Sequence, residues 1–309
     1  MPLYLTEADV DALLTPAEAF SAVEASCERL ARGAVQNPDR VRLEIADGVF
    51  AAMPAADAEL GYAGLKTYAW TGSGTPFLVV LVAIEGTRIE ALIEAGSLGR
   101  LRTAAASAVA ATRLQRPGAS TLGVIGCGRQ AAGHVTALRD ALPSLERVVV
   151  YGRDPQRLAQ FCREHDCEAG ESHSDAGACD IVVTATTAQD PVLRGEWLQP
   201  GALVCGIGAN EPTWRELDNV VLERASFVCC DLRAQAQAEA GDLIEPVARG
   251  VLDWLEVHEL HEVVAGEVQG RSSDDDIVVF KSNGLAAWDL AAAARVVELA
   301  RAAGAGREL

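Results

Sequence analysis

The chain divides into stretches with different hydrophobic periodicities. A helix is predicted to start at Thr15, because Thr15 can cap it, Pro16 suits its first position and Glu18 can reach back to the cap. The helical spacing continues to about Arg32, and Gly33 ends it. Short apolar or alternating segments separated by Gly and Pro then predict a mostly antiparallel sheet, with strands at 41–45, 49–53, 64–70, 77–84 and 89–93.

A helix of very small side chains is predicted next, over residues 97–114. Such residues let a backbone or a cofactor come close, or simply pack a helix tightly. A break at 116–118 (Arg-Pro-Gly) follows, and apolar runs then alternate with helical stretches, which is typical of a parallel sheet built from βαβ units. We expect strands at 121–126, 147–151, 180–184, 202–207 and 226–230, with helices at 129–141 and 155–164.

The last part of the chain returns to a helical pattern. A strand-like run at 277–280 precedes an alanine-rich amphipathic helix at 284–303, which we expect to pack on the first domain. A chain of 309 residues is long enough for two domains. The expected fold class is α/β, with an α+β domain over 1–116 plus 284–309 and a parallel α/β domain over 117–283.

Charge and composition narrow the possible partners. The net charge of −18 argues against nucleic acid and anionic membrane surfaces. The chain has no run of about 20 apolar residues and no signal-like start. Its eight cysteines lack zinc-ligand spacing, so we expect reduced, mostly buried thiols in a cytoplasmic protein and no metal site.

A strand, a glycine turn and a helix follow one another over residues 121–135. Gly126, Gly128 and Ala131 give the pattern G-x-G-x-x-A of dinucleotide-binding sites. Gly126 permits the tight turn, Gly128 lets backbone approach the pyrophosphate, and Ala131 allows close packing of helix on strand. The helix start offers N–H groups to phosphate, and Arg129 can approach it as well. We therefore predict a Rossmann domain that binds a dinucleotide.

The end of the second strand of that domain bears on the cofactor. NAD enzymes place an acidic side chain here to bind the adenosine ribose. In this chain the strand is followed by Gly152, Arg153 and Asp154. Arg153 can pair with the 2′-phosphate of NADP(H), which we therefore expect. Asp154 leaves NAD(H) open, because a shift of one residue would put an acid at this place.

Lysine is almost absent from the chain. Of 26 basic residues only Lys66 and Lys281 are lysines. Lysine remains necessary where a compact ammonium that can lose a proton is required, because an arginine fork is larger and stays charged. Lys66 is therefore a candidate functional residue, whereas for Lys281 a functional role and chance retention both stay open.

Several short segments, in order along nearly the whole chain, resemble the ornithine cyclodeaminase/mu-crystallin family. They are Arg40-Val41, Met53-Pro54, Gly64-Leu65-Lys66, Arg102-Thr-Ala-Ala-Ala-Ser107, Gly126-x-Gly-x-Gln-Ala131, Pro191-x-x-x-Gly-Glu-Trp197, Pro200-Gly201, Trp214-Arg-Glu-Leu-Asp218, Gly241-Asp242 and Phe280-Lys-Ser-x-Gly284.

The resemblance implies a homodimer. It also implies that the N-terminal part and the last helix together form the substrate-binding and dimerisation domain, with the Rossmann domain between them in the sequence. It implies that Arg40, Lys66 and Arg102 hold the α-carboxylate of a small amino or imino acid, a task for which arginine offers two parallel bonds. Asn210 is expected with the substrate-binding residues. The implied cofactor contacts are Arg102, Thr103, Arg129, Gln130, Gly152, Arg153, Thr186, Ile207 and Ser282.

Two departures from the family pattern bear on the reaction. In the family pattern that this chain resembles, ornithine cyclodeaminases carry a glutamate two residues before the Met-Pro pair. They also carry an aspartate just after the strand that ends near Gly208. This chain has Ala51 and Asn210 at these positions. Ornithine cyclisation needs such proton carriers, so the resemblance favours the mu-crystallin-like ketimine reductase branch.

The expected activity is reduction of small cyclic or simple ketimine carboxylates by NADP(H), with Δ1-piperideine-2-carboxylate and Δ1-pyrroline-2-carboxylate as examples. Lys66, or a water that it holds, is the candidate proton donor to the imine. Three alternatives stay open: an alanine dehydrogenase, an ornithine cyclodeaminase, and a non-enzymatic ligand-binding protein.

Overall fold

The computed structural model describes residues 1–71 and 74–309. The chain forms two compact units, each described here by itself. Unit 1 comprises Met1–Ala106 and Gly284–Leu309, and unit 2 comprises Ser107–Asn283. Helix α3 (Gly96–Leu114) begins in unit 1 and ends in unit 2. The molecule has the α/β class expected from the sequence.

Unit 1 is built on a sheet in the order β16-β1-β7-β6-β5-β4-β2, with β3 also paired to β4. Its strands are antiparallel neighbours, as the alternating segments predicted, except that β1 runs parallel to β7. The strands are β1 (Leu3–Leu5), β2 (Val35–Gln36), β3 (Val41–Ile45), β4 (Gly48–Asp57), β5 (Tyr62–Thr71), β6 (Phe77–Ala83), β7 (Arg88–Glu94) and β16 (Arg307–Glu308).

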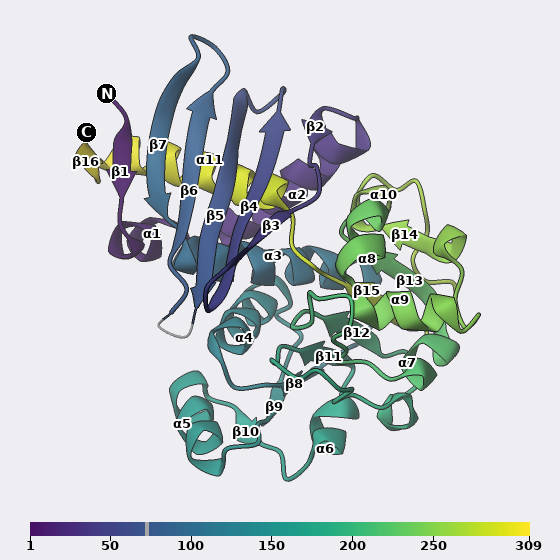
Figure 1. Cartoon of the computed structure of the whole chain (residues 1–309). Helices are drawn as coiled ribbons and strands as arrows, with labels where there is room; N and C mark the ends of the chain where they lie inside the picture. The colour runs from purple at the N-terminus through teal and green to yellow at the C-terminus, as the bar shows by residue number, and fades with distance from the viewer. Residues whose placement is uncertain (72–73) are drawn as a thin grey trace. The chain divides into compact units, whose positions relative to one another are not determined.

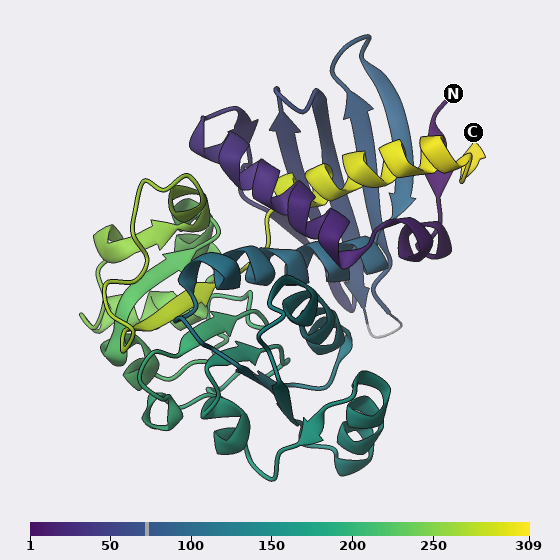
Figure 2. The same ribbon diagram turned by 180° about the vertical axis from the view of Figure 1, so that it is seen from behind.

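Two helices cover one face of this sheet (Figure 2). They are α2 (Pro16–Ala31) and the last helix, α11 (Ala286–Ala303); the short α1 (Glu7–Leu13) precedes α2. Thr15 caps α2 through its hydroxyl, which accepts the Glu18 N–H at 3.2 Å. The expectation for the Glu18 carboxylate was wrong. It accepts a hydrogen bond from Arg295 Nε on α11 at 2.6 Å instead, and a bond between two charged groups is stronger than one to a neutral backbone N–H.

No helix in the described part of unit 1 crosses the other face of its sheet (Figure 1), and the β3 end of this face carries exposed apolar side chains. Val41 and Leu43 are 51% and 55% exposed, and Phe50, directly opposite Leu43 on β4, is 37% exposed. Residues opposite each other in an antiparallel pair share a face, so these side chains form one apolar surface, the β3–β4 patch (Val41, Leu43, Ile45 and Phe50).

Unit 2 is a sheet of eight strands in which every pair is parallel, in the order β10-β9-β8-β11-β12-β15-β13-β14. The strands are β8 (Thr121–Ile125), β9 (Arg147–Tyr151), β10 (Glu168–Ala169), β11 (Ile181–Thr184), β12 (Leu203–Gly206), β13 (Ala225–Cys230), β14 (Val257–Glu259) and β15 (Ile277–Lys281). The late strand β15 enters the middle of the sheet, between β12 and β13.

Helices connect the strands of unit 2: α4 (Arg129–Ala141), α5 (Pro155–His165), α6 (His173–Gly177), α7 (Asn219–Arg224), α8 (Arg233–Glu239), α9 (Gly241–Ala248) and α10 (Leu260–Val264), with 3-10 turns η1 (Gly195–Trp197) and η2 (Trp254–Glu256). The central strands β11 and β12 are buried throughout, as expected for parallel strands covered on both faces. Among the described residues, no helix has the length and apolar character needed to cross a membrane.

Candidate functional site

Three charged side chains meet in unit 1 around a single carboxylate oxygen. Oδ1 of Asp289 accepts a hydrogen bond from Lys66 Nζ at 3.1 Å and from Arg102 Nε at 2.8 Å. Lys66 comes from the middle of β5, Arg102 from α3 and Asp289 from the first turn of α11. All three are at least 94% buried. Two cations thus share one carboxylate inside the protein.

Two buried polar atoms of this cluster, Arg102 Nη1 and Asp289 Oδ2, have no hydrogen-bond partner among the described residues. A buried donor without a partner costs about 1–3 kcal/mol, and such atoms in a folded protein call for an explanation. The Lys66 ammonium also makes only the Asp289 bond within the described part of the chain. Donors therefore remain available for an anionic ligand.

The electrostatic surroundings bring the pKa of the Lys66 ammonium close to neutral pH. Burial lowers the pKa of the Lys66 ammonium, and the positive charge of Arg102 lowers it further. The Asp289 carboxylate opposes both effects and Arg40 adds a small decrease, so the pKa is about 8 instead of 10.5. Lys66 is therefore mostly protonated at neutral pH and can still release a proton.

Arg40 lies just before β3 and joins the cluster through aromatic side chains. Its Nη1 donates a hydrogen bond to the Tyr68 hydroxyl at 3.0 Å. The Tyr68 ring contacts Phe77 with 5.2 Å between centroids, and Lys66 Nζ lies 5.3 Å from the centre of the Phe77 ring. The structure thus brings together Arg40, Lys66 and Arg102, the three cations that the sequence pointed to. Asp289, which links two of them, was missed.

The glycine turn of unit 2 has the geometry that the fingerprint requires. Gly126 has φ +121°, and a Cβ there would lie 2.4 Å from the Ala185 carbonyl oxygen, so only glycine fits. Gly128 is the N-cap of α4 and provides no side-chain cap, while Ala131 is fully buried against the sheet. The first N–H groups of α4 are therefore open to phosphate. Arg129 is exposed and Gln130 half-buried at the same turn.

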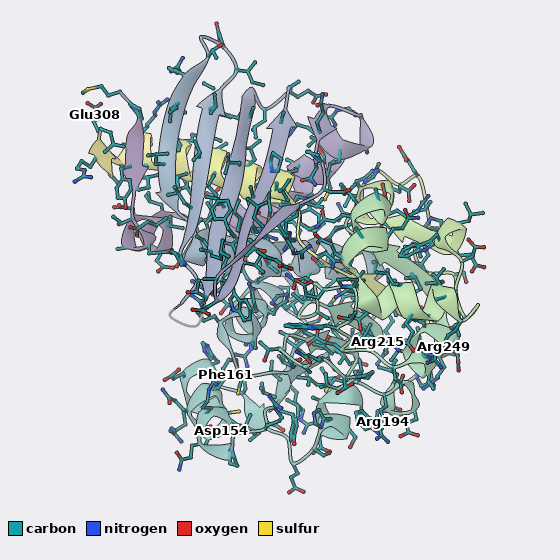
Figure 3. The ribbon with its side chains drawn as sticks, viewed as in Figure 1. Asp154, Phe161, Arg194, Arg215, Arg249 and Glu308 are labelled. Atoms are coloured by element: carbon teal, nitrogen blue, oxygen red, sulfur yellow. The ribbon has the colours of Figure 1, made fainter. Side chains whose placement is uncertain are left out.

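At the end of β9, Gly152 and Asp154 have distinct structural tasks. A Cβ at Gly152 would lie 2.6 Å from the Cys127 sulfur, so the turn and the strand end fit each other closely. Asp154, labelled in Figure 3, is the N-cap of α5, and its Oδ1 accepts the N–H groups of Gln156 and Arg157. Arg153 between them is exposed. Burial lowers the pKa of His173, and the charge of Arg153 lowers it further.

A buried glutamate fixes the loops at the carboxyl ends of β11 and β12. Glu216 accepts hydrogen bonds from the Thr186 N–H and hydroxyl, both at 2.7 Å, and from the Gly208 N–H at 2.6 Å. Burial raises the pKa of Glu216, and these bonds and the charge of Lys281 oppose the rise. Thr186 and the buried Ile207, two of the expected cofactor contacts, are therefore held at one edge of the sheet.

The second lysine belongs to the same network. Lys281 is fully buried, pairs with Asp242 at 3.1 Å and donates hydrogen bonds to the carbonyl oxygens of Ala209 (2.6 Å) and Gly206 (3.3 Å). Asp242 also accepts the backbone N–H of Glu216 at 2.7 Å. The protein thus satisfies the Lys281 ammonium, whose contacts are those of a structural residue. The sequence left this choice open.

The remaining expected residues lie on both units. Thr103 is buried on α3, where its hydroxyl donates to the Gly99 carbonyl oxygen at 2.7 Å. Ser282, after β15, donates to Asp231 at 3.0 Å. Asn210 follows Ala209 in the loop after β12 of unit 2. Ala51 is fully buried on β4.

Four of the buried acids contact the expected site residues or the network around them and were not predicted: Asp231, Asp242, Glu216 and Asp289. Glu216 and Asp242 lie inside segments that carried the family resemblance, and this was the available signal. Asp289 is an acid in an alanine-rich apolar helix, where a fully buried charge would need a partner.

A serine–histidine pair in unit 2 has a different character. Ser107 and His134 are fully buried with 2.9 Å between Oγ and Nε2, and His134 Nδ1 lies 2.8 Å from the Gln130 carbonyl oxygen. Burial lowers the pKa of His134 to about 4. The ring is therefore neutral, with Nδ1 donating to the carbonyl and Nε2 accepting from the serine, and the pair ties α3 to α4.

The sequence and the structure both match known proteins. The model of the ornithine cyclodeaminase/mu-crystallin family matches residues 2–304. A Δ1-pyrroline-2-carboxylate reductase of Bacillus cereus is 36% identical over 71% of this chain and 69% of its own length.

Two solved structures superpose over the whole chain. An archaeal alanine dehydrogenase, a dimer with bound NAD, has a TM-score of 0.93 and 34% identity, and the match covers 100% of this chain and 98% of the other. The Δ1-pyrroline-2-carboxylate reductase of Thermococcus litoralis, in complex with NADH and L-proline, has a TM-score of 0.94 and 28% identity, with 99% and 100% covered.

The pKa of Lys66 predicts how carboxylate binding depends on pH. Lys66 is charged below about pH 8 and neutral above it, so the affinity for pyrrole-2-carboxylate should fall as the pH rises through this value. Loss of a hydrogen bond to a charged group, worth about 1.5–3 kcal/mol, corresponds to at least about a tenfold loss. Calorimetric titration across this pH range measures it. In Lys66→Arg the step should vanish, and an unchanged step would contradict the assignment.

Proposed function

Because the chain belongs to the ornithine cyclodeaminase/mu-crystallin family, we propose that it reduces small ketimine carboxylates to L-amino acids with NADPH. The proposed substrates are Δ1-piperideine-2-carboxylate, Δ1-pyrroline-2-carboxylate and simple imino acids of the same kind. The observation that carries the proposal is the sharing of one Asp289 oxygen by Lys66 and Arg102. In a chain with net charge −18, this buried pair with open donors is suited to a small carboxylate.

In this proposal the cation cluster binds and orients the substrate. Arg102 Nη1 and the Lys66 ammonium donate to the substrate carboxylate, and Arg40 adds a third positive charge. A fixed carboxylate fixes the neighbouring C=N carbon, and such orientation lowers the barrier of a transfer reaction. When bound, the nicotinamide supplies the hydride. Reduction is easier when the imine nitrogen is protonated, and Lys66, with its pKa of about 8, is the proposed donor, directly or through a water.

The proposed cofactor is NADP(H), held by unit 2. The open N–H groups of α4 and the Gly126–Gly128 turn fit the pyrophosphate of a dinucleotide. Asp154 is engaged as the cap of α5, which leaves the exposed Arg153 as the charged group beside Gly152. The exposed arginine supports binding of the 2′-phosphate of NADP(H), although the two solved relatives contain NAD and NADH. Thr186, Ile207 and Ser282 are the proposed contacts farther along the sheet edge.

An alanine dehydrogenase is the second candidate, because the archaeal relative bears that name. The same cations would hold the carboxylate of pyruvate while its imine with ammonia is reduced. Ornithine cyclodeaminase is disfavoured, since Ala51 is a fully buried apolar residue and position 210 carries an amide instead of an acid. The retained cations and dinucleotide turn also argue against a role in ligand storage alone.

We also propose a cytoplasmic homodimer formed through the β3–β4 patch. Its four apolar side chains are 37–55% exposed on one face of unit 1. An apolar face that is uncovered in the monomer is typical of a subunit interface, and the archaeal relative is a dimer. All eight cysteines are free thiols, which supports the proposed location.

Turnover on a substrate panel tests the function. Purified protein should oxidise NADPH with Δ1-piperideine-2-carboxylate or Δ1-pyrroline-2-carboxylate and release no ammonia from ornithine. Lys66→Met and Lys66→Arg should both reduce turnover by about 10²-fold or more, as expected for loss of a proton donor, while NADPH binding stays near normal. Faster turnover with pyruvate and ammonia would favour the alanine dehydrogenase, and a nearly active Lys66→Arg would restrict Lys66 to carboxylate binding.

Cofactor choice is tested at Arg153. Arg153→Ala should weaken NADPH binding about tenfold or more, because a hydrogen bond to a charged group contributes about 1.5–3 kcal/mol, and leave NADH binding little changed. Arg157→Ala, in the first turn of the adjoining helix α5, serves as the matched control. Fluorescence titration with both cofactors measures the effect. A wild-type preference for NADH would refute the assignment.

The proposed interface is tested with a charge in the β3–β4 patch. Leu43→Glu should convert the dimer to a monomer, because two buried carboxylates would face each other across a symmetric contact. Leu255→Glu, at an 82% exposed leucine of unit 2, is the control and should stay dimeric. Sedimentation velocity distinguishes these states, and a dimeric Leu43→Glu variant would place the interface elsewhere.

A further inference from the structure

We propose that Asp289 is a positioning residue, which holds the Lys66 ammonium and the Arg102 guanidinium together so that one substrate carboxylate meets both. The inference deepens the proposed function, because it assigns the third member of the carboxylate-binding cluster. It starts from the position of Asp289, whose Oδ1 is the common acceptor of both cations, 3.1 Å from Lys66 Nζ and 2.8 Å from Arg102 Nε.

The start of α11 is built to keep Asp289 in place. Asn37 accepts the backbone N–H of Ala287 at 2.9 Å and fixes the first turn. Gly284 has φ +81°, and a Cβ there would lie 2.7 Å from Arg102 Nη1. A glycine is therefore needed both for the backbone and for the space that the guanidinium occupies. Asp289 lies in the first turn of its helix, where the helix dipole stabilises a carboxylate.

The other buried lysine shows how a purely structural pair differs. Lys281 pairs with Asp242, and two backbone carbonyl groups accept its remaining N–H donors. Lys66 has no such carbonyl partner among the described residues, and the donor Arg102 Nη1 also lacks a partner there. A pair that serves only the fold would be expected to satisfy its donors. The Asp289 cluster instead leaves two cations with donors to offer.

Asp289 also controls the charge of Lys66. The charged groups that act on Lys66 are Asp289 from α11, Arg102 from α3 and Arg40 from the segment before β3. Burial and both arginines lower the pKa of Lys66, and Asp289 is the group that raises it. Without the carboxylate the pKa falls below about 8, and Lys66 loses its proton at a lower pH.

Because the chain has only two lysines, the effect of Asp289 on the pKa of Lys66 can be measured directly. Protein labelled with ¹³C and ¹⁵N lysine gives signals from Lys66 and Lys281 alone, and Lys66→Met assigns them. In Asp289→Asn the Lys66 midpoint should move down by about one pH unit or more, as expected for the loss of an adjacent opposite charge. Asp242→Asn, which removes the partner of the other lysine, is the matched control and should leave the Lys66 midpoint unchanged.

Carboxylate binding supplies the second measurement. Calorimetry with pyrrole-2-carboxylate should show at least about a tenfold weaker affinity for Asp289→Asn at neutral pH, with part of the loss recovered at lower pH where Lys66 is protonated again. A variant that was only misfolded would show no recovery. NADPH binding and circular dichroism verify that the variant is folded.

An unmoved Lys66 midpoint in folded Asp289→Asn overturns the proposal. If that variant does not fold, Asp289→Glu decides: it keeps the charge on a longer arm, so the midpoint should stay near that of wild type while the carboxylate affinity falls. Unchanged affinity in Asp289→Glu would overturn the positioning role. The titration needs no turnover, so absence of imine reduction would refute the proposed function and leave this test intact.

Discussion

A charge that is buried must have a partner, and both units of this protein are organised by that constraint. In unit 1, Asp289 is almost fully buried and joins α11 to β5 and α3 through Lys66 and Arg102. In unit 2, Glu216 joins the ends of β11 and β12. An unpaired carboxylate at such depth would cost several kcal/mol. Each acid therefore fixes the backbone groups that supply its partners, and the loops at the sheet edge acquire one defined arrangement.

Local sequence patterns were sufficient to predict most of the helices and strands whose formation depends on neighbouring residues. The capped start of α2, the alternating strands β3 to β7 and the Gly126–Ala131 turn all depend on neighbours in the chain, and each was predicted. Strand β15 shows the limit of such patterns. Its apolar run predicts a strand, but its place between β12 and β13 depends on residues more than 40 positions away. The same limit applies to the short β1, β2 and β16, which exist through pairing alone.

The candidate site shows a similar division. Arg40, Lys66 and Arg102 stand out in the sequence because the chain is acidic and poor in lysine, and the structure brings them together. Asp289 does not stand out, since a single acid in an alanine-rich helix is normally exposed. Its partners are nearly 200 residues or more away in the chain. The sequence left the role of Lys281 open, and only its satisfied contacts distinguish this structural ammonium from one with donors to spare.

The close fit of Gly152 against Cys127 links the phosphate turn to the end of β9. A side chain at position 152 would meet the Cys127 sulfur at 2.6 Å, so the thiol would first have to adopt another rotamer or become smaller. The acid that many NAD enzymes carry at the end of this strand therefore fits here only if the Cys127 side chain moves aside. Evolution or engineering of cofactor preference along this route is thus coupled to the room that residue 127 leaves.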